Sequence, residues 1–311
     1  MNTAIRAALT AALTLPLTVP AAASVLVPVS QFNHPMLAGH ALPARSVFQN
    51  LHARHNTKKV SHFSFPYGIA LDGAGNVYVG NVDAHNVVIV NPEYKVSSNT
   101  ITNGIGEPVS LATDTYGDLY VGNLNGSGGN VLKYNSSLSL VQTITANAQY
   151  PYGIAVDQAQ DLYLANDTSL SVDDPYGNSI SSSIFGGYYV YSVAVGGPNV
   201  YAFLDGETAF GNTSVALRGL TLQYIDGPIT TAVPTGSACA AVESACWFDD
   251  TSNDSLSFAT LPGSGFGVGL SYAPAGLAVD PVRNRVYVAD PLNNAIHVYN
   301  ATTLAFEKTI T

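Results

Sequence analysis

The chain has 311 residues, of which 10% are charged, and its 21 acidic and 11 basic side chains give a formal net charge of −10 at pH 7. A surface of this sign repels phosphate groups, which argues against nucleic acid and anionic membranes as partners. The charged fraction is far below the roughly 25% of ordinary domains, while 28 Gly and 18 Tyr are present. This composition is typical of an all-β protein with many turns.

The first 23 residues have the pattern of a secretory signal peptide. Arg6 is followed by an apolar Ala/Leu/Thr stretch, and Ala21-Ala22-Ala23 offers an Ala-x-Ala cleavage site before Ser24. Pro16 and Pro20 interrupt the stretch, which is too short to span a bilayer. The sequence therefore predicts export, to the periplasm or the cell exterior, without a transmembrane segment.

Residues 24–62 are expected to form a leader with a closing strand. Residues 46–49 and 58–63 contain short apolar runs that fit an extra strand closing the last blade, or half of a seventh blade. A leader capped by one strand is the simpler interpretation. His52, His55 and His62 also lie here, and on a helix they would suit a metal, but the stretch shows no helical apolar face and a solvated segment is favoured.

From residue 63 onward, a repeat of forty-odd residues organises the chain. A Pro-x-Gly-type run ending in Asp occurs four times, and its prolines, Pro66, Pro108, Pro151 and Pro274, are 42, 43 and 123 residues apart. Because 123 is three times 41, two degenerate copies lie between the third and the last. Six repeats result, with a seventh left open.

Each clear copy continues into a turn and a second apolar run, which begins at Val77, Leu119, Leu162 and Val286, and then into two further alternating segments. Four strands of period two in each repeat make one antiparallel sheet with the apolar first strand innermost. Such sheets bury their faces only against one another. The predicted fold is an all-β, six-bladed β-propeller of four-stranded antiparallel blades spanning 63–311, with seven blades as the alternative.

The run Pro-x-Gly-Ile-Ala-x-Asp followed by Tyr-Val-x-Asn resembles the NHL family and the related YVTN-type repeats. The resemblance covers residues 63–311 and is strongest in copies one, two, three and six. It implies a propeller, usually six-bladed in the NHL family and often seven-bladed in YVTN proteins.

Residues that recur in every repeat are interpreted as scaffold. Asp72, Asp114, Asp157 and Asp280 each stand four residues before an Asn or Asp in the first hairpin turn, where Asx side chains bind the backbone. A tyrosine recurs in the second strands, and it is expected to pack between blades; these are Tyr78, Tyr120, Tyr163, Tyr201 and Tyr287.

A candidate ligand site lies just after the second strand of each blade, on the face of the central channel. The ring consists of Asn81, Asn123, Asn166, Asp205, Asp250 and Asp290. The three Asp make one half of this face acidic, which could hold a cation such as calcium or hydrogen-bond a sugar, although Asx residues at loop starts are also ordinary turn chemistry. Tyr67 and Tyr152 would add aromatic surface beside it.

The two cysteines, Cys239 and Cys246, are expected to form a disulfide. An even pair in an exported protein favours a bridge. Their spacing of seven residues equals that from Ala70 to Val77, so they should face each other across the first hairpin of blade five. A metal or nucleophilic pair is disfavoured because no ligand set with zinc spacing accompanies them.

We expect a monomeric, non-enzymatic binding module for a protein, a glycan or a small polar ligand, with no cofactor unless the ring holds a divalent cation.

The rival interpretation is a metal-dependent lactone hydrolase or lyase of a propeller type. The lactone hydrolases resembled here hold a cation with Glu, Asn and Asp at the starts of innermost strands, where this chain has Tyr67, Val109, Tyr152 and Ala275. No G-x-S-x-G motif and no His paired with a carboxylate at metalloenzyme spacing is found. A structural surface-layer component is the second alternative.

Overall fold

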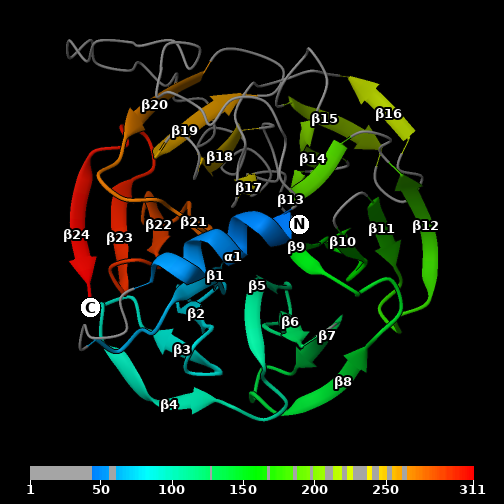
Figure 1. Cartoon of the computed structure of the whole chain (residues 1–311), viewed down its shortest axis with the longest axis horizontal. Coiled ribbons are helices and arrows are strands. Elements are labelled where there is room, and N and C mark those ends of the chain that lie inside the picture. The colour runs from blue at the N-terminus through cyan, green and yellow to red at the C-terminus, as the bar shows by residue number, and fades with distance from the viewer. Residues whose placement is uncertain are drawn as a thin grey trace, which may run out of the picture.

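The residues placed by a computed structural model of the chain form six antiparallel sheets of four strands each, arranged as blades around a central channel (Figure 1). The described ranges are 44–55, 61–126, 128–166, 169–184, 188–196, 199–206, 213–218, 223–226, 237–239, 245–250, 254–260 and 265–311, with only the backbone described for residues 44–47 and for parts of blades three to five. Each sheet takes four consecutive strands in chain order. The predicted six-bladed propeller is confirmed.

The first three blades contain the most regular strands. Blade one comprises β1 (Pro66–Leu71), β2 (Val77–Asn81), β3 (Asn86–Val90) and β4 (Val96–Ile101). Blade two comprises β5 (Glu107–Thr113), β6 (Leu119–Asn125), β7 (Gly128–Tyr134) and β8 (Leu140–Ile144). Blade three comprises β9 (Pro151–Val156), β10 (Leu162–Asn166), β11 (Ser169–Asp173) and β12 (Ser179–Ile184).

The last three blades include the two degenerate copies. Blade four comprises β13 (Tyr188–Gly196), β14 (Asn199–Gly206), β15 (Thr213–Arg218) and β16 (Gln223–Asp226). Blade five comprises β17 (Ser237–Cys239), β18 (Ala245–Asp250), β19 (Ser255–Thr260) and β20 (Gly265–Gly269). Blade six comprises β21 (Leu277–Asp280), β22 (Arg285–Asp290), β23 (Ala295–Asn300) and β24 (Phe306–Ile310).

Contacts between neighbouring innermost strands close the ring, including those of β1 with β21. The repeated Gly after Pro allows this close approach. A Cβ on Gly153 would lie 2.8 Å from Ser192 Cα in the next blade, and a Cβ on Gly68 would lie 2.8 Å from Ser110 Cα. Gly276 of blade six donates its backbone N–H to Tyr67 O of blade one at 2.9 Å. The glycine of the repeat is therefore a packing requirement between blades.

The scaffold interpretation of the repeated Asp and Tyr is confirmed in blades one to three. Asp72 Oδ1 accepts hydrogen bonds from the backbone N–H groups of Ala74 and Asn76, both at 2.9 Å, and Oδ2 accepts one from Tyr78 Oη at 3.1 Å. Blades two and three repeat this pattern. All five recurring tyrosines are buried, and burial next to Asp72 raises the pKa of Tyr78 to about 12.

The leader provides a helix, not the strand expected at residues 46–49. Helix α1 (Ala44–Arg54) buries Phe48 and Leu51, and His52 and His55 share that face at helical spacing. Two basic side chains in the last turn, His52 and Arg54, suit the negative end of the helix dipole. The apolar face was missed because only two of its four positions are apolar. Each described sheet is built without a leader strand.

The cysteines have the predicted placement. Cys239 on β17 is the direct cross-strand partner of Cys246 on β18. Cys246 is fully buried, and none of the described cysteines is free. Next to it, Trp247 takes the place of the blade tyrosine and donates from Nε1 to Ala301 O of blade six at 2.9 Å.

Within the described residues, no helix has the length and apolar character needed to cross a membrane.

Candidate functional site

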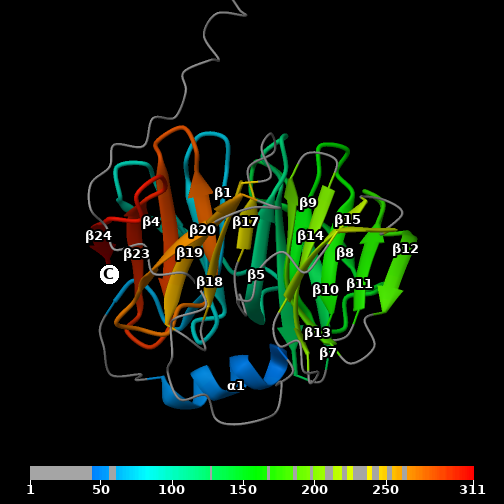
Figure 2. The same cartoon turned by 90° about the horizontal axis from the view of Figure 1, so that it is seen from above.

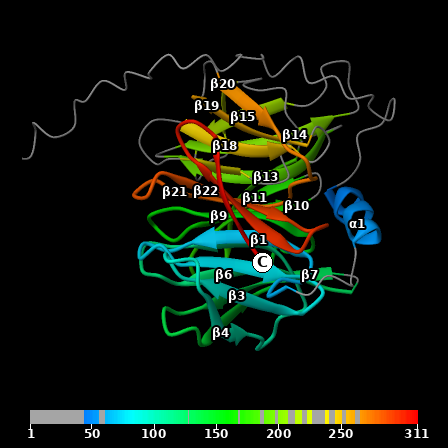
Figure 3. The same cartoon turned by 90° about the vertical axis from the view of Figure 1, so that its left-hand side faces the viewer.

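The two ends of the channel have different structures. The strands of each blade alternate in direction, so the ring residues after the second strands lie at one end and the first hairpin turns lie at the other. Helix α1 lies across the first end (Figures 1, 2 and 3). We call this the covered end, and the end with the first hairpin turns the open mouth.

At the covered end, the described Asn side chains of the ring bind the loops of their own blades. Asn123 Oδ1 accepts a hydrogen bond from Gly106 N at 2.6 Å, and its Nδ2 donates to Gly104 O at 3.4 Å and to Asn130 Oδ1 at 3.1 Å. Asn81 and Asn166 repeat this arrangement toward the segments that precede β1 and β9. Asn81 and Asn123 are completely buried. These amides hold the segment that leads into each innermost strand.

The Asp half of the ring is described at one position. The side chains of Asp205 and Asp250 lie outside the described residues; their backbones end β14 and β18. Asp290 is buried, and its Oδ1 accepts a hydrogen bond from Asn293 N at 3.0 Å. Its Oδ2 lies 3.0 Å from His297 Nε2.

His297 is therefore paired with a carboxylate seven residues away, which the sequence search for metalloenzyme spacings missed. His297 Nδ1 lies 2.9 Å from Thr309 Oγ1 on the outermost strand, and Tyr272 stacks on the imidazole at 4.3 Å between ring centroids. Antiparallel pairing of β22 with β23 brings the two side chains together. Among the described residues, no group of three or more His, Cys, Asp or Glu has metal-holding geometry.

The structure brings Tyr67 and Tyr152 together beneath α1. Phe48 of the helix packs against both rings, with centroids 5.2 Å from Tyr67 and 6.1 Å from Tyr152. Both tyrosines are buried, and burial, with smaller contributions from Tyr152 and Asp249, raises the pKa of Tyr67 above its usual range. In this conformation α1 covers the aromatic surface that the sequence predicted to contact a ligand.

Polar contacts at the end of α1 fix it to two different blades. His52 Nε2 lies 2.6 Å from Asp83 Oδ1, and His55 Nδ1 lies 2.8 Å from Asp83 Oδ2, in the turn between β2 and β3. His55 Nε2 lies 2.7 Å from Asn294 Oδ1, in the turn between β22 and β23. We call His52, His55, Asp83 and Asn294 the histidine latch.

Of the α1 side chains that the structure describes, Phe48 and Leu51 are the buried apolar ones. The histidine latch adds polar contacts beside them.

Phe65, which lies between the latch and the aromatic surface, has a strained backbone. Its φ is +50°, a left-handed conformation that is unfavourable for a bulky residue, and it precedes Pro66. Asn294 Oδ1 accepts a hydrogen bond from Phe65 N at 2.9 Å, and the ring packs 4.8 Å from His52 and 5.2 Å from His55. Phe65 therefore packs against both histidines of the latch and shares Asn294 with His55 as a hydrogen-bond partner.

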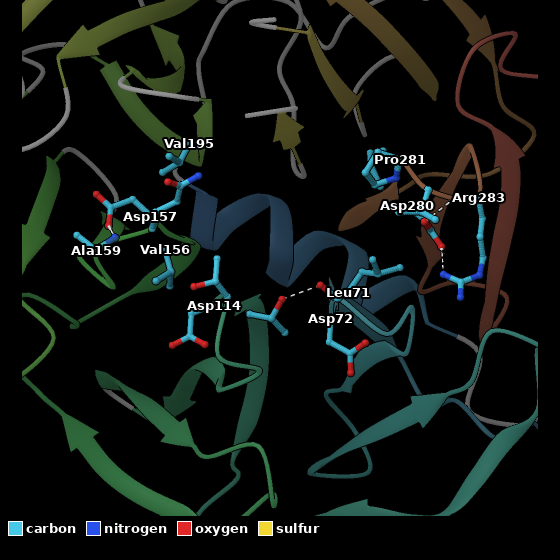
Figure 4. A pocket seen from close by; sticks show the side chains of 16 residues that line it. Leu71, Asp72, Asp114, Val156, Asp157, Ala159, Val195, Asp280, Pro281 and Arg283 are labelled. Carbon is cyan, nitrogen blue, oxygen red and sulfur yellow. Dashed lines mark hydrogen bonds and ion pairs between the residues drawn. The ribbon is translucent and has the colours of Figure 1, made fainter. Parts of the chain in front are cut away.

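The open mouth contains a pocket of about 700 Å³ (Figure 4). It is lined by residues of the first hairpins of blades one, two, three and six and by Val195 of blade four. The corresponding hairpin of blade five, residues 240–244, lies outside the described residues. Aliphatic side chains such as Leu71, Val156 and Val279 alternate with four carboxylates and one guanidinium, namely Asp72, Asp114, Asp157, Asp280 and Arg283.

Hydrogen bonds between blades brace this mouth. Thr113 Oγ1 donates to Leu71 O at 2.6 Å, and Gln160 Nε2 donates to Asp114 Oδ2 at 2.6 Å. Arg283 pairs with Asp280 at 3.0 Å and also donates to Ala74 O of blade one at 3.2 Å. The wall of the pocket is thus fixed before any ligand arrives.

Comparison with known proteins identifies the class as β-propeller. No family model and no curated protein matches the chain. Among solved structures, a streptogramin B lyase superposes with a TM-score of 0.57 at 16% identity, over 81% of this chain and 85% of that one. Virginiamycin B lyase from Staphylococcus aureus gives 0.55 at 14% identity, over 79% and 84% of the two chains. Hydrazine synthase from Kuenenia stuttgartiensis gives 0.54 at 15% identity, over 79% of each. At these identities the likeness establishes the fold alone.

Proposed function

We propose that the chain is an exported propeller of NHL or YVTN type that binds a protein, glycan or small polar ligand without transforming it. We place the ligand at the open mouth instead of the covered end. The observation that carries this proposal is the pocket of about 700 Å³ lined by the first hairpins of blades one, two, three and six, within the range of about 300–1,000 Å³ usual for ligand sites. The ring residues, Tyr67 and Tyr152 contact a ligand in this proposal only when α1 is displaced.

The surroundings of the mouth favour a binding surface. Three large side chains on turns of the same end are exposed, with 69% of Tyr116, 81% of Tyr176 and 84% of Val282 accessible. Tyr116 and Tyr176 occupy turns of the same type in blades two and three, in which an Asp two residues earlier accepts the Tyr N–H at 2.9 Å. Rigidly presented tyrosines contribute contact area at low entropic cost.

The test is a screen of the purified protein by thermal shift and calorimetry against neutral sugars, amines and short peptides, followed by a mouth variant. Thr115→Arg places a long charged side chain at the pocket, whereas Thr100→Arg makes the same change on the outermost strand β4. We expect Thr115→Arg to weaken binding of a hit at least about tenfold, or about 1.4 kcal/mol. Equal affinities of the two variants would refute the placement.

The alternative function is a metal-dependent lactone hydrolase or lyase. It is favoured by the pairing of Asp290 with His297 and by the names of two structural neighbours. Turnover of lactones or of streptogramin B that EDTA abolishes would replace the binding proposal by this one. Self-assembly in light scattering at neutral pH would instead favour a surface-layer component.

The disulfide between Cys239 and Cys246 is part of the proposal, since it fits an exported protein and their cross-strand register. Non-reducing mass spectrometry should give a mass two hydrogens below that of the dithiol. Closing so short a loop is expected to stabilise blade five by about 2–3 kcal/mol. Alkylation of both thiols without prior reduction would contradict the bridge.

A further inference from the structure

The contacts of α1 with the blades indicate how the covered end opens. We propose that the histidine latch is a proton-operated fastener, which holds α1 across the channel when His52 and His55 are protonated and releases it when they are neutral. The proposal does not depend on a ligand at the open mouth.

The argument begins with the two nitrogens of His55, whose side chain is 1% exposed. Nε2 faces Asn294 Oδ1 at 2.7 Å. This atom must be the amide oxygen, because it also accepts a hydrogen bond from the backbone N–H of Phe65. Nδ1 faces Asp83 Oδ2 at 2.8 Å. Both neighbours of the imidazole are therefore acceptors.

A neutral imidazole carries a proton on only one ring nitrogen, so the other would direct its lone pair at an oxygen. Nδ1 of His55 makes no hydrogen bond. Its favourable interaction with Asp83 is therefore the attraction between opposite charges. The imidazolium removes the repulsion at both nitrogens and forms an ion pair with Asp83.

His52 adds a second positive charge on the same carboxylate. Its Nε2 lies 2.6 Å from Asp83 Oδ1, and 39% of its side chain is exposed. His52 lies on α1, His55 directly follows it, and Asp83 lies on blade one. Loss of their protons therefore weakens the attachment between helix and propeller without removing a contact inside a blade.

The other titratable and charged groups around the helix do not account for such a switch. Tyr67 and Tyr152 lie beneath Phe48, Asp249 interacts electrostatically with Tyr67, and Tyr189 represents β13, which contacts α1. Arg54, on the helix itself, is exposed. His85, beside Asp83, is exposed and its Nδ1 lies 2.8 Å from Gly106 O. Among these groups only His85 is of a type that ordinarily titrates near neutral pH.

The direction of the pH effect follows from the charges. The docked helix binds protons on its histidines, so docking is favoured at the lower pH and weakens as the pH rises and the protons are lost. Release of α1 uncovers the aromatic surface of Phe65, Tyr67 and Tyr152.

Hydrogen exchange of the full-length protein tests the latch. Amides of 44–55 are compared at about pH 5.5 and about pH 8, after correction for intrinsic exchange, with the β7–β8 segment of blade two, which contains no latch residue, as internal reference. We expect protection of α1 to fall by about tenfold or more at the higher pH, since each proton coupled to docking contributes up to tenfold per pH unit. Equal protection at both pH values would overturn the proposal.

Variants separate the latch from its surroundings. Asp83→Asn and His55→Gln should each abolish the pH dependence, and His55→Gln leaves every blade residue in place if Asp83→Asn fails to fold. His85→Asn, which keeps a residue type that tolerates the φ of +51° at this position, and Glu93→Gln, an equal change of charge on the exposed turn at the other end, should behave as the wild type. A pH dependence that persists in His55→Gln and disappears in His85→Asn would assign the switch to His85 and refute the proposal.

Discussion

The two ends of the channel are built by the same repeat, but α1 covers one end, whereas the other end contains a pocket. At the covered end, Asn81 and Asn123 are buried and bound to their own loops, and α1 lies over the aromatic surface. At the open mouth, the repeated Asp also binds its own turn, yet the hairpins leave a pocket. Symmetric residues thus build both ends, and the difference between them comes from a leader segment outside the repeat.

The largest expected effect on the stability of the propeller comes from the close contacts between neighbouring blades. Gly276→Ala would place a Cβ against Tyr67 O at the seam between blades six and one, so we expect a loss of about 1–3 kcal/mol or more, measured by urea unfolding. The matched control is Gly73→Ala, because a Cβ at Gly73 has no atom within 4 Å. If both variants unfold at the same urea concentration, the seam does not close as described.

A second change separates the two ends. Phe48→Ala removes the ring that packs on Tyr67 and Tyr152, and a buried Phe truncated to Ala ordinarily costs about 3–5 kcal/mol. Because α1 lies across one end of the ring and adds no strand to a described sheet, we expect undocking of 44–54 with little change in the urea midpoint of the propeller. A large loss of propeller stability would show that the helix is an integral part of the ring.

A third prediction concerns alkaline pH, which should act on the Tyr–Asp pairs that support the open mouth. Burial raises the pKa of Tyr78 to about 12 and also raises that of Tyr163. The folded state therefore disfavours tyrosinate, and the stability from these groups is full below pH 10 and declines as pH rises from about 10 toward 12. Tyrosinate absorbance should titrate late in the folded protein. Titration of all 18 tyrosines near pH 10 before unfolding would contradict the burial.

The smallest effect is expected within a single turn. Tyr78→Phe removes the hydrogen bond from Tyr78 Oη to Asp72 Oδ2, whose other partners remain. A cost of about 0.5–1.5 kcal/mol is expected in urea unfolding. A neutral result would mean that packing of the ring, not its hydroxyl, explains the repeated tyrosine.

The repeat made the blades predictable because its Pro, Gly, Asp and Tyr report local geometry. Even Trp247 in a degenerate copy was placed correctly, as a buried residue of the second strand. Helix α1 was missed because, among its side chains that the structure describes, the buried apolar ones are Phe48 and Leu51 alone, and its histidines face a blade more than twenty residues away in sequence. The pairing of Asp290 with His297 was missed because it depends on strand register.

A signal for the latch was nevertheless present in the sequence. Two residues after the ring Asn, blade one has Asp83 where blades two and three have Asn125 and Thr168. Comparison between blades at this position would have singled out Asp83. The pocket could not be found in this way, since its lining consists of the same turn in several blades and its volume depends on how the blades are arranged around the channel.

Hydrogen exchange with and without a ligand from the screen tests the placement of function at the open mouth most directly. The account predicts added protection at the mouth hairpins, in residues 71–76, 113–118, 156–161 and 279–285, and none in α1 at about pH 5.5, where the helix is docked. Added protection confined to 44–55 and to the ring of Asn81, Asn123 and Asn166 would contradict it.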